Sequence, residues 1–149
     1  MEKIIFRLAK SEDIPQMVEF LKLLFTEEEE FTPDYEKQTK GLSLIIENPI
    51  MGEIIVAEHG DKVVGMVNLL YTISTAEGGK VAILEDLVVN PDYRSVGIGS
   101  SILNQAIEYC ENQGLKRITL LTDEDPKVMT FYKRHGFKKS PMIPLRMIF

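Results

Sequence analysis

The stretch that decides the fold reads Leu87-Val88-Val89-Asn90-Pro91-Asp92-Tyr93-Arg94-Ser95-Val96-Gly97-Ile98-Gly99-Ser100. It starts as the apolar end of an extended segment, stops at Asn90-Pro91 and passes through two glycines into a helical pattern. Glycines at such a place let successive backbone N–H groups face one point at the positive end of a helix dipole, a geometry that binds phosphate. The stretch therefore predicts a strand, a phosphate-binding turn and a helix.

The turn matches neither of the two best-known nucleotide-binding patterns. No Lys-Ser/Thr pair follows the glycines, as the ATP-binding loop requires. The dinucleotide pattern would need a glycine at position 102, which is Ile102. Two glycines alone are equally compatible with an ordinary tight turn, so the local pattern leaves both interpretations open.

The residues after the turn continue with alternating helical and extended patterns. Ile98, Ile102, Ala106 and Cys110 recur every fourth residue and predict a helix over about 97–113, closed by Gly114. A short strand over 117–122 follows, and Asp125-Pro126 begins another helix that ends at Gly136. From Phe137 onward the chain is expected to be extended again.

The residues before the turn supply the rest of the sheet. Strands are predicted over 4–8, 53–58, 63–73 and 80–89, and helices over about 14–25 and 34–47. The order β-α-α-β-β-β-α-β-α-β predicts an α/β (α+β mixed sheet) fold, with antiparallel hairpins, one parallel pair and helices on both faces. With 149 residues and no linker, we expect a single domain, 1–149.

Composition excludes several classes of protein. The net charge of −6 argues against a nucleic-acid partner, which requires a basic surface. No apolar run approaches eighteen residues, so we expect no membrane span. The single cysteine and the absence of a recognisable signal peptide indicate a cytoplasmic protein. His59 and His135 lack ligand spacing, so no metal site is expected.

Residues 87–99 resemble the signature of the GNAT acetyltransferase family, whose core is Arg/Gln-x-x-Gly-x-Gly/Ala after a strand. Phe131-Tyr132-Lys133-Arg134-His135-Gly136-Phe137 resembles a second signature of the same family. Locally, residues 84–87 and 131–134 look most like spermidine/spermine N-acetyltransferases. Together the two signatures lie in the expected order on the expected elements.

The resemblance implies acetyl-coenzyme A as the acyl donor, with no metal. Coenzyme pyrophosphate would be held by the turn, and the pantetheine arm would pair with the strand before it. Ser95 stands where the family usually has glycine, at a cost of about 1 kcal/mol if its φ is positive. The implied cofactor-binding residues are Leu87, Val88, Val89, Arg94, Ser95, Val96, Gly97, Ile98, Gly99, Ser100, Asp125 and Tyr132. For Asp125, capping of the last helix is an equally good interpretation.

Two residues are candidates for the proton transfers of an acetyl transfer. The period of two places Glu85 on one strand face with Val81, Ile83, Leu87 and Val89, where desolvation would favour a general base, while Asp86 would point to the opposite face. A surface-facing glutamate is the alternative. Tyr132 stands at the family's tyrosine position and would protonate the departing thiolate; core packing is its alternative.

The sequence therefore predicts an N-acetyltransferase that acts by direct sequential attack of a primary amine. A small cationic amine, polyamine- or aminoglycoside-like, is the expected acceptor, and Glu27–Glu30 is a candidate acidic collar for it. A protein or peptide amine and a catalytically idle coenzyme A-binding module are the alternatives. Cys110, on an apolar stripe, is expected to be inert. The sequence is compatible with a homodimer as well as with a monomer.

Overall fold

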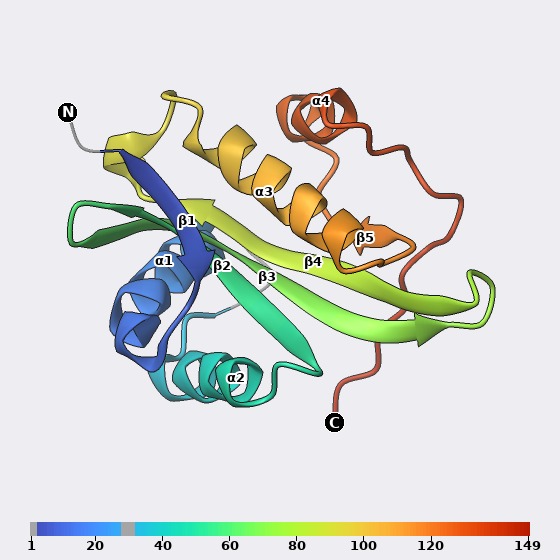
Figure 1. Cartoon of the computed structure of the whole chain (residues 1–149), viewed down its shortest axis with the longest axis horizontal. Coiled ribbons are helices and arrows are strands. Elements are labelled where there is room, and N and C mark those ends of the chain that lie inside the picture. Colours follow the sequence, from blue (N-terminus) through green and yellow to red (C-terminus); the bar gives the residue numbers. More distant parts are fainter. Residues whose placement is uncertain (1–2, 28–31) are drawn as a thin grey trace.

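The computed structural model describes residues 3–27 and 32–149. Its strands form one five-stranded mixed sheet (Figure 1). The strand order is the chain order, β1-β2-β3-β4-β5. The first four strands pair antiparallel, and β4 pairs with β5 in parallel. The mixed sheet predicted from the sequence is thus confirmed. Its strands are β1 (Ile4–Leu8), β2 (Gly52–His59), β3 (Lys62–Ser74), β4 (Gly79–Val89) and β5 (Ile118–Leu120).

Helices cover both faces of the sheet, as predicted (Figure 1). The first pair, α1 (Ile14–Glu27) and α2 (Tyr35–Glu47), lies on one face, and α3 (Ile98–Asn112) and α4 (Pro126–Arg134) lie on the other. Two short 3-10 turns complete the set, η1 (Ser11–Asp13) before α1 and η2 (Pro91–Tyr93) after β4. None of the helices within residues 3–27 and 32–149 combines the length and apolarity that crossing a membrane needs.

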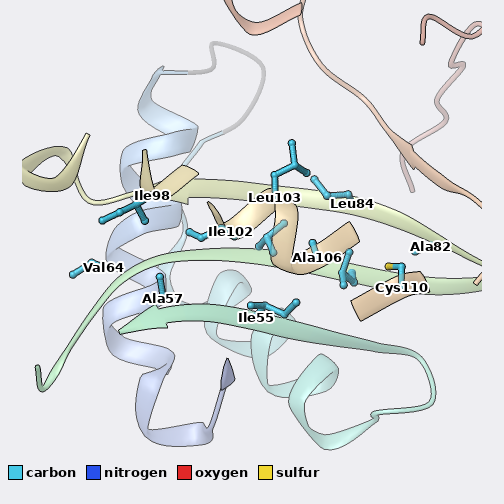
Figure 2. Packing of buried hydrophobic residues seen from close by; sticks show 12 residues of the cluster. Ile55, Ala57, Val64, Ala82, Leu84, Ile98, Ile102, Leu103, Ala106 and Cys110 are labelled. Atoms are coloured by element: carbon cyan, nitrogen blue, oxygen red, sulfur yellow. The ribbon is translucent and has the colours of Figure 1, made fainter. Parts of the chain in front are cut away.

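The α3 face holds the larger hydrophobic cluster, shown in Figure 2. The fourfold spacing read from the sequence is confirmed, because Ile98, Ile102, Ala106 and Cys110 are all buried against the sheet. Each fully buried large aliphatic side chain contributes about 1.5–3 kcal/mol. The helix approaches β3 so closely that a Cβ on Gly65 would lie 2.6 Å from Ile102 Cδ1. This cluster fixes α3, and hence the turn at its N-terminus, on the sheet.

The other face is covered by the apolar stripe of α1. Ile14, Met17, Val18 and Leu21 are buried there, as their helical spacing predicts. Asp34 begins α2, since its side chain accepts a hydrogen bond of 3.1 Å from the Lys37 backbone N–H. The acidic segment expected to border the acceptor lies mostly outside the described residues: Glu27 ends α1, and Glu28–Glu30 are not described.

A β-bulge in β4 changes which residues share a face. Asn68 of β3 lies opposite Glu85, but Met66 lies opposite Val88, so the β4 strand carries one extra residue between these pairs. Asp86 occupies this place with a φ of 55°. The prediction that Glu85 shares a face with Leu87 and Val89 is therefore wrong, because those two residues pack on the α3 face with Ala82 and Leu84.

The predicted last strand, from Phe137 onward, is also wrong. Residues 137–149 contain no strand or helix. Pro141 and Pro144 each lack a backbone N–H, so this segment cannot donate a regular ladder of hydrogen bonds to a neighbouring strand. Several of its apolar side chains, including Met142, Ile143 and Leu145, are more than 80% exposed.

Candidate active site

The edge of β4 is partly uncovered where it leaves β5. The parallel pairing joins only Ala82, Ile83 and Leu84 of β4 to β5. Beyond Leu84 the strand continues through residues 85–89, and on that side no described strand pairs with it. The backbone N–H and C=O groups of such an edge are available to an added extended chain.

The glycine turn follows the uncovered edge after the short 3-10 turn η2. Ser95 has a φ of 69° and Gly97 a φ of 84°, so the turn uses two left-handed positions. The first helical hydrogen bond of α3 runs from Ser101 N–H to the Gly97 carbonyl, at 3.0 Å. The N–H groups of Ile98, Gly99 and Ser100 therefore precede the helical ladder and have no helical acceptor. The predicted strand, turn and helix are confirmed. The left-handed conformation of Ser95 costs about 1 kcal/mol, as expected for a residue other than glycine.

Space is available above this turn. Apart from Gly97 and its two chain neighbours, no atom of the described residues lies within 4 Å of the place that a Cβ on Gly97 would occupy. A Cβ on Gly99 would meet only Val89 Cγ2, at 3.6 Å. Arg94, Ser95 and Val96 are exposed. The N-terminus of α3 is thus sterically open, and the residues predicted to bind phosphate lie around it. Phosphate binding by this turn stays a prediction.

Tyr132 lies on α4 with its ring against the α3-side core. Its ring makes edge-to-face contacts with Phe131, at 5.1 Å between centroids, and with Phe137, at 5.8 Å. Leu87, Val89 and Tyr132 pack against the same cluster of buried residues. The packing role expected as one alternative is therefore present, and the proton-donating role stays a prediction.

Glu85 is exposed rather than enclosed among apolar neighbours. Asp86 does not point away from it, because the bulge turns the Asp86 carboxylate toward Asn68, which donates a hydrogen bond of 2.6 Å from Nδ2 to Oδ2. Since Asn68 lies opposite Glu85 in the register, the two carboxylates belong to one side of the sheet. The expectations that Glu85 is desolvated and that Asp86 lies on the opposite face are both wrong.

Asp125 and Cys110 occupy the structural places predicted for them. The Asp125 side chain accepts a hydrogen bond of 2.8 Å from Lys127 N–H at the start of α4, with Pro126 following it. Cys110 is 2% exposed, and burial raises the pKa of its thiol to about 11, so it stays protonated. Within residues 3–27 and 32–149, no group of three His, Cys, Asp or Glu side chains is arranged to hold a metal ion.

Sequence reasoning missed a polar cluster under the far end of α3. Tyr71 and Tyr109 both donate to Glu53 Oε1, at 3.0 and 2.6 Å. Burial, together with the Glu53 carboxylate, raises the pKa of Tyr109 to about 12 and raises that of Tyr71 further. The three residues come from β3, α3 and β2, and no local pattern connects positions so far apart in sequence.

Comparisons with known proteins agree with this architecture. Residues 14–137 match the model of the acetyltransferase (GNAT) family. An uncharacterized N-acetyltransferase of Methanocaldococcus jannaschii is 36% identical over 97 residues, which cover 62% of this chain and 43% of that protein. The thialysine N-epsilon-acetyltransferase of Mus musculus is 36% identical over 98 residues, 60% of this chain and 57% of that protein.

The matched region thus spans about half the length of these curated relatives. Among solved structures, a predicted acetyltransferase from Clostridium acetobutylicum, determined with acetyl-CoA, superposes with a TM-score of 0.81. That match covers 97% of this chain and 96% of the other at 16% identity, so it concerns the fold alone.

Proposed function

The chain belongs to the GNAT acetyltransferase family, and on this premise we propose that it transfers an acetyl group from acetyl-coenzyme A to a primary amine. One observation carries the proposal: the uncovered edge of β4, residues 85–89, is followed after the short η2 turn by the open glycine turn. An extended chain that carries amides would fit the open strand edge, and phosphates at its end would fit the glycine turn. Coenzyme A has that chemical form.

In this proposal each part of the surface recognises one part of the coenzyme. Residues 87–89 pair with the amides of the pantetheine arm as an added strand would. The N–H groups at the start of α3 that have no helical acceptor receive the pyrophosphate, helped by the positive end of the helix dipole. A described GNAT-fold neighbour determined with acetyl-CoA supports the choice of ligand. Asp125 is proposed to contact the coenzyme from the start of α4.

The chemistry then needs three contributions from the chain. Acetyl-coenzyme A supplies the acetyl group as a thioester. A backbone N–H of residues 87–89 donates a hydrogen bond to the carbonyl oxygen that gains negative charge. Tyr132 donates a proton to the departing thiolate, and Glu85 removes one from the attacking amine. Because Glu85 is exposed, we propose that this proton leaves through a water molecule.

A small cationic amine is the proposed acceptor. Glu85 and Asp86 lie on one side of the sheet, and the chain carries a net charge of −6. Such a surface attracts a cation and raises its association rate. The Mus musculus relative, a thialysine N-epsilon-acetyltransferase by name, likewise acts on an amine. The polyamine-like subtype and a homodimer stay predictions within this proposal.

The alternatives predict different results in one experiment. Release of coenzyme A thiol from acetyl-coenzyme A would be followed with a panel of polyamines, aminoglycosides, lysine analogues, amino sugars and peptides. The proposal expects turnover with at least one small cationic amine, together with a rise in melting temperature on coenzyme A addition. Turnover with peptides only would favour the peptide-amine alternative. A thermal shift without turnover on any amine would favour the idle coenzyme-binding module.

A further inference from the structure

Both histidines of the chain form hydrogen bonds with residues at the ends of the glycine turn, one at each end. The chain contains two histidines, His59 at the end of β2 and His135 at the end of α4. His59 lies 34 positions before Tyr93, and His135 lies 35 positions after Ser100, yet each forms a side-chain hydrogen bond with that residue. Tyr93 immediately precedes the turn, and Ser100 lies in the first turn of α3.

The contact at the entry of the turn is made by Tyr93. Its hydroxyl lies 2.8 Å from His59 Nδ1, and the two rings meet edge to face with centroids 5.4 Å apart. Tyr93 is the last residue of η2, and Arg94 and the left-handed Ser95 follow at once. The ring contact and the hydrogen bond together hold the start of the turn on the end of β2.

The contact at the exit is made by Ser100. Its Oγ lies 2.8 Å from His135 Nε2, while His135 Nδ1 lies 2.9 Å from Asn104 Oδ1. An amide oxygen only accepts hydrogen bonds, so Nδ1 carries the proton, and in the neutral ring Nε2 accepts from the Ser100 hydroxyl. Asn104 and Ser100 are one helical turn apart on α3, so His135 spans both. The Ser100 side chain is thereby held by His135.

The exit contact also joins the turn to α4, the helix of Tyr132. His135 is the C-terminal cap of α4, and its backbone N–H donates to the Tyr132 carbonyl at 3.0 Å. Its ring packs edge to face on Phe131 at 5.1 Å. One imidazole therefore ties the first turn of α3 to the helix that carries the proposed proton donor.

We propose that His59 and His135 are positioning residues of the coenzyme site, which hold the two ends of the phosphate-binding turn in the shape that binds coenzyme A. A turn that carries two left-handed positions relaxes easily unless its flanks are held, and a pre-shaped site avoids the cost of ordering it on binding. Neither histidine needs to contact the reacting atoms. The proposal rests on the proposed function, because it assumes coenzyme A as the ligand of the turn.

Two double-mutant cycles test the inference, with coenzyme A binding measured by calorimetry. The exit cycle uses Ser100→Ala, His135→Ala and the double variant; the entry cycle uses Tyr93→Phe, His59→Ala and the double variant. Ser100→Ala and Tyr93→Phe remove only the hydrogen bond of their cycle and are expected to weaken binding about fivefold. The two histidine variants lose that bond and their ring contacts, so they should bind at least as weakly. In each cycle the double variant should bind no more weakly than the weaker single variant, because both substitutions break one link.

Kinetics distinguish positioning from a general loss of stability. In the two histidine variants the KM for acetyl-coenzyme A should rise while kcat at saturating acetyl-coenzyme A stays within about twofold of wild type. Asn104→Ala should shift binding in the same direction by a smaller factor. Tyr109→Phe, which deletes a half-buried, hydrogen-bonded hydroxyl at the other end of α3, is the matched control and should leave coenzyme affinity unchanged.

The outcomes separate this inference from the proposed function. If wild type binds coenzyme A and the histidine variants bind it equally well, the positioning role is wrong. Additive losses in the double variants would also overturn it, since the histidines would then act without Ser100 and Tyr93. If wild type itself shows no binding of coenzyme A, the proposed function fails instead.

Discussion

The Asn68 side-chain amide donates a hydrogen bond of 2.6 Å to the Asp86 carboxylate at the point where the register of β3 and β4 shifts. Asn68 is only 3% exposed, and Asp86 has a left-handed φ of 55°. Asparagine and aspartate are among the few residues that tolerate this conformation. The hydrogen bond and the bulge support each other, and together they direct residues 87–89 toward the proposed coenzyme site.

Replacing Asn68 with aspartate should destabilise the chain strongly. Asn68→Asp keeps the shape but sets one carboxylate against another, so the lost hydrogen bond and the repulsion should lower the free energy of unfolding by about 2–3 kcal/mol. The double variant Asn68→Asp/Asp86→Asn exchanges donor and acceptor and should recover most of the loss. Urea unfolding of the wild type, both single variants and the double variant measures this. No recovery in the double variant would show that the bulge does not depend on this bond.

Gly99→Asp should have opposite effects on stability and on coenzyme binding. A Cβ at Gly99 meets only Val89 Cγ2 at an ordinary distance, and a carboxylate near a helix N-terminus is favourable. The melting temperature of the free chain should therefore not fall, while the rise caused by coenzyme A should disappear through repulsion of its phosphates. Gly99→Asn, which has the same shape without the charge, should keep part of that rise. A full coenzyme response in Gly99→Asp would place the phosphates elsewhere.

Tyr132→Phe should reduce turnover without loosening the fold. The ring contacts with Phe131 and Phe137 remain, so the aromatic packing of α4 and the folded state should be kept. Loss of a general acid lowers turnover about ten- to a thousand-fold, with little change in coenzyme affinity. Steady-state kinetics measure the turnover, and coenzyme titration measures the affinity. Wild-type turnover in this variant would assign Tyr132 to packing alone.

Glu85→Gln should remove the acidic limb of the pH–rate profile. Glutamine cannot accept the proton of the amine, and because Glu85 is exposed the substitution should not disturb packing. The kcat/KM of wild type and variant would be compared across pH at saturating acetyl-coenzyme A. An acidic limb that persists in the variant would point to Asp86, a bound water or deprotonation of the free amine as its origin.

Asp13 should contribute stability that disappears in acid. Burial opposes its ionisation, but hydrogen bonds of 2.8 and 3.0 Å from Arg7 and one of 2.7 Å from Lys10 N–H outweigh burial and lower the pKa of Asp13 below the ordinary 3.8. Because the pKa of Asp13 is lower in the folded state than in the unfolded state, its carboxylate stabilises the folded state at any pH above the unfolded-state pKa. This stabilisation is lost as the pH falls through the folded-state pKa. Asp13→Asn should therefore cost about 2 kcal/mol at neutral pH, and its difference from wild type should shrink below about pH 4.

The control for that measurement is Glu12→Gln, which removes the same charge at the exposed neighbouring position. Its stability should follow that of wild type across the whole pH range. A constant difference between wild type and Asp13→Asn down to the lowest pH would mean that the carboxylate is not the source of the stabilisation.

The amino-acid sequence by itself determined the elements and the turn that matter most. The spacing from Ile98 to Cys110 predicted α3, Asp125-Pro126 predicted the start of α4, and Gly97 and Gly99 marked the turn. These features depend on residues within one or two helical turns of each other. Their physical causes, namely the helical period, N-capping and the freedom of glycine at positive φ, act locally and so can be read from a sequence.

Tertiary structure alone decided which side chains meet. The extra residue in β4 could not be read from its own alternation, because a bulge is defined only against the register of β3, and it brought Asp86 to the side of Glu85. Likewise, nothing near His59 or His135 in sequence indicates Tyr93 or Ser100, which lie 34 and 35 positions away. Such contacts arise only when the sheet and helices pack, since packing brings together side chains that chain connectivity keeps apart.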